Sequence, residues 1–152
     1  MSFQNYMAIA LEEARAAAQR GEVPVGACVV DENGNVIARA GNRTRELSDP
    51  SAHAEVLAIR GATASLRRER LDGLSLYVTL EPCAMCAGLV AAARISRLYF
   101  GAADPKSGGV LHGARVFSHP QSHHRPEIYD GINETECSTL LSEFFVNIRE
   151  KP

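Results

Sequence analysis

The stretch Glu81-Pro82-Cys83-Ala84-Met85-Cys86 places two thiols three residues apart, directly after a proline. It follows Leu76-Tyr77-Val78-Thr79-Leu80, an apolar and partly β-branched run that is typical of a strand. A helix that begins at Pro82 brings positions i and i+3 to one face, so both sulfurs would point the same way. The positive partial charge of a helix N-terminus also favours thiolate over thiol. The stretch therefore predicts a strand-to-helix junction that can hold one metal ion.

A second predicted helix start, Asp49-Pro50-Ser51-Ala52-His53-Ala54-Glu55, also carries metal-capable groups. In open α/β sheets, sites form where strands end and helices begin, so we expect His53 to meet Cys83 and Cys86. Imidazole and thiolate are zinc ligands, and three protein ligands with water in the fourth position is the catalytic pattern. Glu55 does not share the direction of His53 on a helix, so we expect it to carry protons for the bound water.

The remaining patterns predict strands that alternate with helices, which indicates an α/β protein. An early hairpin around Asn33-Gly34 makes the sheet mixed rather than fully parallel. The predicted strands are 25–30, 36–41, 74–80, 97–101 and 127–129. The predicted helices are 3–20 with Ser2 as cap, 50 to about 70 with Asp49 as cap, 82–94, and 133–149. Residues 101–125 are expected to form a loop with one helical turn near 110–115.

The terminal helix has an apolar stripe that predicts which of its side chains are buried. The stripe contains Cys137, Leu140, Leu141, Phe144, Phe145 and Ile148. Core packing is the default for such a stripe, although Phe144 or Phe145 could instead form a dimer contact or a stacking surface. Cys28 lies in another apolar pattern and, like Cys137, is expected in the core.

Length and composition narrow the class of protein. The 152 residues suit a single domain spanning 1–152, with a net charge of −2 and no global basic field. No signal peptide and no apolar run of membrane-spanning length is evident, so we expect a cytoplasmic protein that does not enter a membrane. In a reducing compartment, CxxC indicates metal or redox chemistry rather than a disulfide. The region 94–125 is locally basic and is the best candidate for an RNA-facing surface, although a solvated face is the simpler interpretation.

The combined pattern H-x-E…P-C-x-x-C is the signature of zinc nucleobase deaminases. The resemblance extends from about Val23 to Phe145, and over this length the chain is similar to bacterial tRNA-specific adenosine deaminases. The segments that carry it include Val23-Pro24-Val25-Gly26-Ala27, Gly41-Asn42-Arg43, residues 49–55, residues 76–88, residues 94–108 and Leu140-Leu141-Ser142-Glu143-Phe144-Phe145.

The resemblance implies a three-layer α/β/α cytidine-deaminase-like fold with a five-stranded mixed sheet, assembled as a homodimer. It implies hydrolytic conversion of adenosine to inosine at the wobble position of a tRNA anticodon, with an arginine tRNA as substrate. The implied metal site holds one Zn²⁺ per subunit on His53, Cys83 and Cys86, with Glu55 as proton shuttle. The implied substrate contacts are Asn42, Val25, Ala54, Asp104, Lys106 and Ser107. Of these, Asn42 would hydrogen-bond the flipped base and Val25 would pack on its face.

Other interpretations share parts of this pattern. A guanine deaminase, or another free-base or nucleoside deaminase, would carry the same zinc signature on the same fold. A non-catalytic zinc or RNA-binding module would need a fourth protein ligand, such as His112 or His119. Asn42 could be a turn residue beside Gly41, and the loop around Lys106 could be merely solvated. One departure from the family is His123-His124-Arg125, where the family usually has Asn-His-Arg.

Overall fold

The structure, a computed structural model, describes residues 5–150. A five-stranded sheet forms its middle layer, in the order β2-β1-β3-β4-β5. Strand β1 is antiparallel to both β2 and β3, whereas β3, β4 and β5 run parallel. The strands are β1 (Gly26–Val30), β2 (Val36–Gly41), β3 (Ser75–Leu80), β4 (Arg97–Ala102) and β5 (Glu127–Tyr129). The predicted mixed sheet is confirmed.

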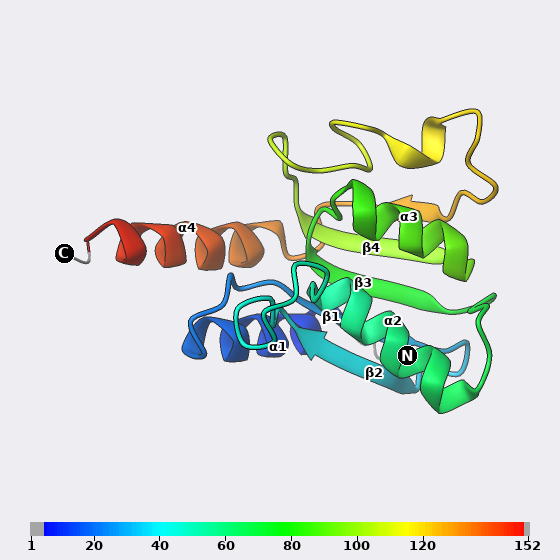
Figure 1. Ribbon diagram of the computed structural model, residues 1–152, viewed down its shortest axis with the longest axis horizontal. Coiled ribbons are helices and arrows are strands. Elements are labelled where there is room, and N and C mark those ends of the chain that lie inside the picture. The colour runs from blue at the N-terminus through cyan, green and yellow to red at the C-terminus, as the bar shows by residue number, and fades with distance from the viewer. Residues whose placement is uncertain (1–4, 151–152) are drawn as a thin grey trace.

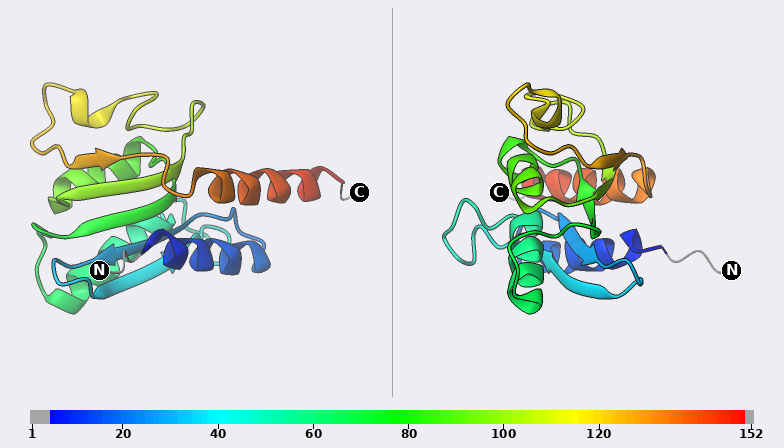
Figure 2. Two further views of the ribbon diagram at one scale, coloured as in Figure 1. Left: turned by 180° about the vertical axis from the view of Figure 1, so that it is seen from behind. Right: turned by 90° about the vertical axis from the view of Figure 1, so that its right-hand side faces the viewer.

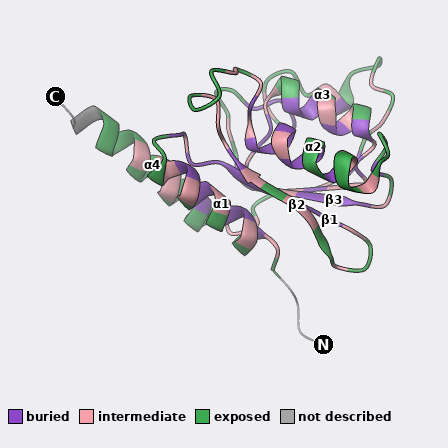
Figure 3. Ribbon diagram, turned by 60° about the horizontal axis from the view of Figure 1, so that its bottom comes forward, coloured by how far each residue is buried: buried purple, intermediate pink, exposed green. Residues whose placement is uncertain are grey.

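Helices cover both faces of the sheet, as Figures 1 and 3 show. The helices are α1 (Met7–Gln19), α2 (Ala54–Leu66), α3 (Ala84–Ala93) and α4 (Glu134–Glu150), with a short 3₁₀ turn η1 (Val116–Ser118). Helices α2 and α3 lie on one face, and α1 and α4 lie on the other. This gives the predicted three-layer α/β/α arrangement, and α4 projects beyond the end of the sheet (Figures 1 and 2).

The larger core lies between the sheet and the α2–α3 layer. It is built from aliphatic and aromatic side chains, among them Val29, Ala58, Leu76, Val90 and Phe100. A smaller cluster under α1 and α4 contains Met7, Ala10, Leu11, Ala102 and Cys137. Cys28 and Cys137 are buried, as predicted. The packing of α2 on β1 and β2, and of α3 against α2, holds the two helix starts side by side.

The starts of α2 and α3 differ from the sequence prediction by a few residues. Helix α2 begins at Ala54 with His53 as N-cap, not at Pro50 with Asp49 as N-cap. The Asp49 carboxylate instead accepts hydrogen bonds from the amide and hydroxyl of Ser51, at 2.9 and 2.7 Å, and so forms a separate turn. Helix α3 begins at Ala84 with Cys83 as N-cap, two residues after Pro82. Both shifts place a metal-capable residue at a helix cap.

The C-terminal half of α4 also differs from the prediction. Its apolar stripe is buried only at Cys137; Phe145 and Ile148 are 44% and 45% exposed, and Phe144 is half-buried. The default prediction of core positions for Phe144 and Phe145 was therefore wrong, because the helix extends past the sheet that could cover them. The predicted turn near 110–115 was also misplaced, since the 3₁₀ turn is at 116–118. Helix α1 begins at Met7 with Tyr6 as N-cap, not at Phe3, and the predicted cap Ser2 lies outside the described residues.

No helix in residues 5–150 combines the length and the apolar character needed to span a membrane.

Candidate active site

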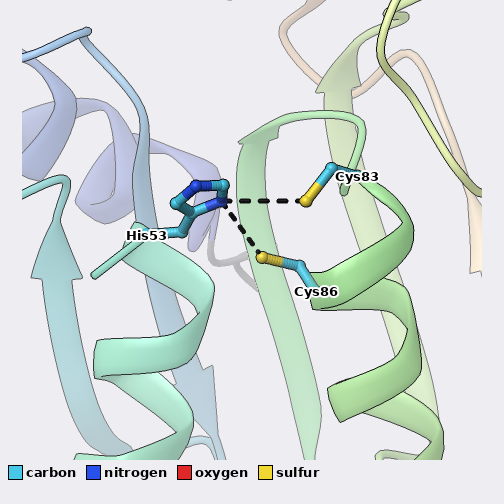
Figure 4. Close-up of side chains that lie close together, drawn as sticks. All are labelled: His53, Cys83 and Cys86. Carbon is cyan, nitrogen blue, oxygen red and sulfur yellow. Dashed lines mark hydrogen bonds between the residues drawn. The ribbon is translucent and has the colours of Figure 1, made fainter. Parts of the chain in front are cut away.

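His53, Cys83 and Cys86 meet where α2 and α3 begin side by side (Figure 4). The Nδ1 atom of His53 lies 3.7 Å from the Cys83 sulfur and 3.4 Å from the Cys86 sulfur. The three ligand atoms lie within 4.8 Å of one another. Among the described residues, no other cluster of three or more His, Cys, Asp or Glu side chains could hold a metal ion.

The spacing of these three atoms suits zinc. With Zn–N near 2.0–2.1 Å and Zn–S near 2.3 Å, tetrahedral angles place ligand nitrogen and sulfur about 3.6 Å apart. The observed distances of 3.4 and 3.7 Å bracket that value. The donor set is one imidazole and two thiols, which also fits zinc rather than calcium or magnesium. Because Nδ1 faces both sulfurs, it is the histidine atom that would bind the ion.

The thiols of Cys83 and Cys86 have pKa values shifted in opposite directions. Without a metal, hydrogen bonds from Cys86 and His53 lower the pKa of Cys83 to about 3. The pKa of Cys86 is raised, because its proton is held by Cys83 and because it is buried. A metal ion that binds both sulfurs would therefore have to displace the proton of Cys86.

Glu55 lies in the first turn of α2, beside the metal-capable cluster. Its side chain is 4% exposed, and burial raises the pKa of its carboxyl above the usual range. It lies within hydrogen-bonding reach of Cys86. A buried carboxyl with a raised pKa binds a proton more readily than an exposed one, which suits a group that both accepts and donates protons.

Asn42 directly follows the last residue of β2 and contacts the start of α2. Its amide N–H donates to the Val25 carbonyl at 3.1 Å, and its side-chain Oδ1 accepts the N–H of Ala54 at 2.9 Å. This second bond satisfies a free N–H group at the start of α2. Since Oδ1 is used by the protein, the Nδ2 amide group is the part of Asn42 left for a ligand. Val25, Asn42 and Ala54 thus form one hydrogen-bonded unit beside His53.

Asp104, Lys106 and Ser107 occupy a turn directly after β4. The Asp104 carboxylate accepts the Ser107 N–H at 2.9 Å, so it stabilises the turn itself. Lys106 and Ser107 are exposed. The Gly109 N–H donates to the carbonyl of Pro82 at 2.8 Å, which brings this segment against the start of α3. The turn therefore lies next to the metal-capable cluster.

The basic residues of the 94–125 region are less available than the sequence suggests. The Arg97 guanidinium donates to the Ser75 hydroxyl and to the Gly73 carbonyl, at 2.9 and 2.6 Å. His124 lies 2.6 Å from the Ile95 carbonyl through Nε2. Arg94 follows the last residue of α3, at the opposite end of that helix from Cys83. These residues do not form one patch around the site.

The two histidines considered as a fourth ligand lie elsewhere. His112 Nδ1 is 2.8 Å from a Glu81 carboxylate oxygen, and His119 accepts the Gln121 N–H at 3.2 Å. Neither belongs to the metal-capable cluster. The arrangement of three protein ligands favours an open fourth position over a closed structural site.

Sequence reasoning assigned no role to two buried glutamates. Glu22 is 1% exposed and accepts the N–H groups of Arg45 and Glu46, at 3.1 and 2.8 Å. Glu81 is 2% exposed and accepts N–H groups of the 104–112 segment. For Glu81, the only signal in the sequence was a charged residue between an apolar strand and Pro82. Any residue type except proline can supply a backbone N–H group, so the partners of both glutamates could not be predicted from the sequence.

Comparison with known proteins agrees with this geometry. Residues 1–102 match the cytidine and deoxycytidylate deaminase zinc-binding region. The tRNA-specific adenosine deaminase of Agrobacterium fabrum is 55% identical over 97% of this chain and 94% of its own. A solved tRNA:A34 deaminase, studied for A-to-I editing, is 56% identical, with a TM-score of 0.88 over 90% of this chain and 98% of its own.

A more distant structure provides a contrast. The guanine deaminase from Nitrosomonas europaea is 25% identical, with a TM-score of 0.75 over 92% of this chain and 82% of its own. It shares the fold at less than half the sequence identity of the two tRNA deaminases described above. The chain therefore belongs to the tRNA-specific adenosine deaminase family, within the cytidine and deoxycytidylate deaminases.

Proposed function

We propose that this protein converts adenosine to inosine at the wobble position of a tRNA anticodon, with an arginine tRNA as substrate. The observation that carries the proposal is the convergence of His53 Nδ1 with the Cys83 and Cys86 sulfurs beside a buried Glu55. The family membership selects tRNA-bound adenosine among the bases that such a centre could attack.

His53, Cys83 and Cys86 would hold one Zn²⁺ per subunit. A zinc ion held by these residues would supply the nucleophile, a water molecule whose pKa is lowered to about 7. Glu55 would accept one proton of the attacking water as its oxygen adds to C6 of the base, and would donate that proton to the neighbouring ring nitrogen. It would then take the remaining proton of the added hydroxyl and pass it to the amino group, which leaves as ammonia while the C6 carbonyl forms. Such proton transfers are worth about 10²–10⁴ in rate.

Asn42, Val25 and Ala54 would position the flipped base. The Nδ2 group of Asn42 is a donor, so it would meet a hydrogen-bond acceptor on the purine edge. Val25 is 5% exposed and offers an apolar contact for the ring. Asp104, Lys106 and Ser107, in the neighbouring turn, would contact the flanking nucleotides.

We also propose that the protein is a cytoplasmic homodimer that joins through the outer face of α3. The exposed side of α3 carries small and apolar residues, including Gly88, Ala92 and a Met85 that is 43% exposed. Next to it, a cavity of about 390 Å³ separates α3 from the 114–123 segment. Light scattering should give twice the 16.4 kDa mass of the chain, and a monomer mass would contradict the dimer.

The function is tested by offering the purified protein three substrates: an arginine-tRNA anticodon stem-loop, free adenosine and guanine. We expect inosine in the stem-loop and little turnover of either small molecule. Turnover of guanine without deamination of the stem-loop would favour the free-base deaminase. Bound zinc without turnover of any of the three would favour a binding module.

A further inference from the structure

Glu81 is a buried carboxylate that directly follows β3 and lies two residues before Cys83. Its Oε1 atom accepts the Asp104 N–H at 3.0 Å and lies 2.8 Å from His112 Nδ1. Its Oε2 atom accepts the N–H groups of Val110, Leu111 and His112, at 3.1, 2.9 and 3.1 Å. Both oxygens are therefore committed to one segment of the chain.

That segment has little other regular support. Between β4, which ends at Ala102, and η1, which begins at Val116, the structure has neither helix nor strand. Burying a carboxylate costs several kcal/mol unless hydrogen bonds replace its hydration. Here the loop backbone provides that replacement, and the carboxylate in turn provides the acceptors that a strand or helix would otherwise supply.

The loop is also pressed against the start of α3. A Cβ on Gly109 would lie 2.6 Å from the Ala84 nitrogen and 2.9 Å from the Cys83 carbonyl carbon. A Cβ on Gly108 would lie 2.6 Å from the Glu81 carboxylate. The backbone of the loop therefore packs directly on the residue that caps α3, with no room for side chains between them.

We propose that Glu81 is a positioning residue for RNA binding. It holds the turn that carries Asp104, Lys106 and Ser107 against the Cys83 end of α3, so that nucleotides next to the reactive base meet a preformed surface. This inference rests on the proposed function. It assigns Glu81 no contact with the base or the metal, because its carboxylate is directed to the loop.

A preformed loop lowers the entropy lost on binding, so loosening it should weaken RNA binding more than it slows the chemical step. Glu81→Gln keeps the shape of the side chain and replaces one acceptor oxygen with a donor group. At fixed ionic strength, we expect the KM for the anticodon stem-loop to rise about tenfold or more, with kcat changed less than about threefold. Zinc content should stay at the wild-type level.

Two further variants distinguish an effect of loop order from an effect of overall stability. Gly108→Ala leaves the carboxylate intact but pushes the loop away from it, so the same rise in KM is expected. Glu134→Gln removes an exposed carboxylate from the first turn of α4 and should change neither constant. Hydrogen exchange should be faster at the amides of residues 104 and 110–112 in the first two variants only.

Two results would overturn the inference. One is faster exchange of these amides with an unchanged KM, which would mean that the loop order does not matter for RNA. The other is loss of zinc together with kcat, which would place the effect of Glu81 at the metal site. If the wild-type protein fails to deaminate the stem-loop, the proposed function fails instead, and the exchange data still report whether Glu81 orders the loop.

Discussion

The centre at the starts of α2 and α3 and the neighbouring 103–115 loop are organised by different kinds of contact. In the centre, the contacts are between side chains: an imidazole, two thiols and a carboxyl converge from the starts of α2 and α3. In the 103–115 loop, the organising contacts are backbone N–H groups that converge on the single carboxylate of Glu81. We therefore expect the centre to determine the reaction, and the loop to determine the affinity for a particular RNA.

The sharpest way to test the first half of this comparison is to remove a metal ligand. Cys83→Ala leaves two protein ligands, so we expect metal content to fall to background and deamination to fall below detection. Atomic absorption on the purified variant measures the first effect, and inosine formation measures the second. Normal zinc content in this variant would show that the metal is held elsewhere.

Glu55→Gln should separate the proton carrier from the metal. The amide fits the same buried space but cannot shuttle protons, so we expect kcat to fall about 10²–10⁴-fold. Zinc content and stem-loop affinity should be preserved, as measured by atomic absorption and fluorescence anisotropy. Loss of zinc from this variant would argue that Glu55 is a ligand instead.

Asn42→Ala tests a residue that supports the start of α2 and is proposed to bind the base. It removes both the donor offered to the base and the acceptor for the Ala54 N–H, so we expect kcat/KM to fall about 10–100-fold. Thermal unfolding should report a lower stability as well, because the N–H of Ala54 loses its partner. An unchanged kcat/KM would mean that Asn42 is only a turn residue.

Lys106→Ala should have a smaller effect, confined to RNA binding. Lys106 is exposed, and a phosphate contact there would contribute one released counterion. We therefore expect the slope of log Kd against log salt to fall by about one, with kcat unchanged. Equal slopes for the variant and the wild type would remove Lys106 from the RNA interface.

The smallest effect is expected at the projecting end of α4. Because Phe145 is 44% exposed, Phe145→Ala should change the free energy of unfolding by less than about 0.5 kcal/mol. Urea denaturation measures this. A loss of about 3 kcal/mol or more, as for a core phenylalanine, would show that another surface covers this helix in solution.

The different kinds of contact also explain what could be predicted from the sequence. The strands, the α/β class and the convergence of His53 with the CxxC follow from residue types and their order along the chain. The exact helix starts do not, because the Asp49 carboxylate bonds to Ser51 instead of capping α2. The role of Glu81 is equally hidden, since any residue can offer the backbone N–H groups that it accepts. The exposure of Phe145 depends on where the sheet ends, which no local pattern encodes.

Inosine at the wobble position of arginine tRNA tests the central claim most directly. Arginine tRNA would be isolated from cells with and without this protein and analysed by mass spectrometry of its nucleosides. We expect inosine at the wobble position in cells that have the protein, unmodified adenosine in cells that lack it, and restoration by the wild-type gene but not by Glu55→Gln. Equal inosine in both kinds of cell, or restoration by Glu55→Gln, would contradict the account.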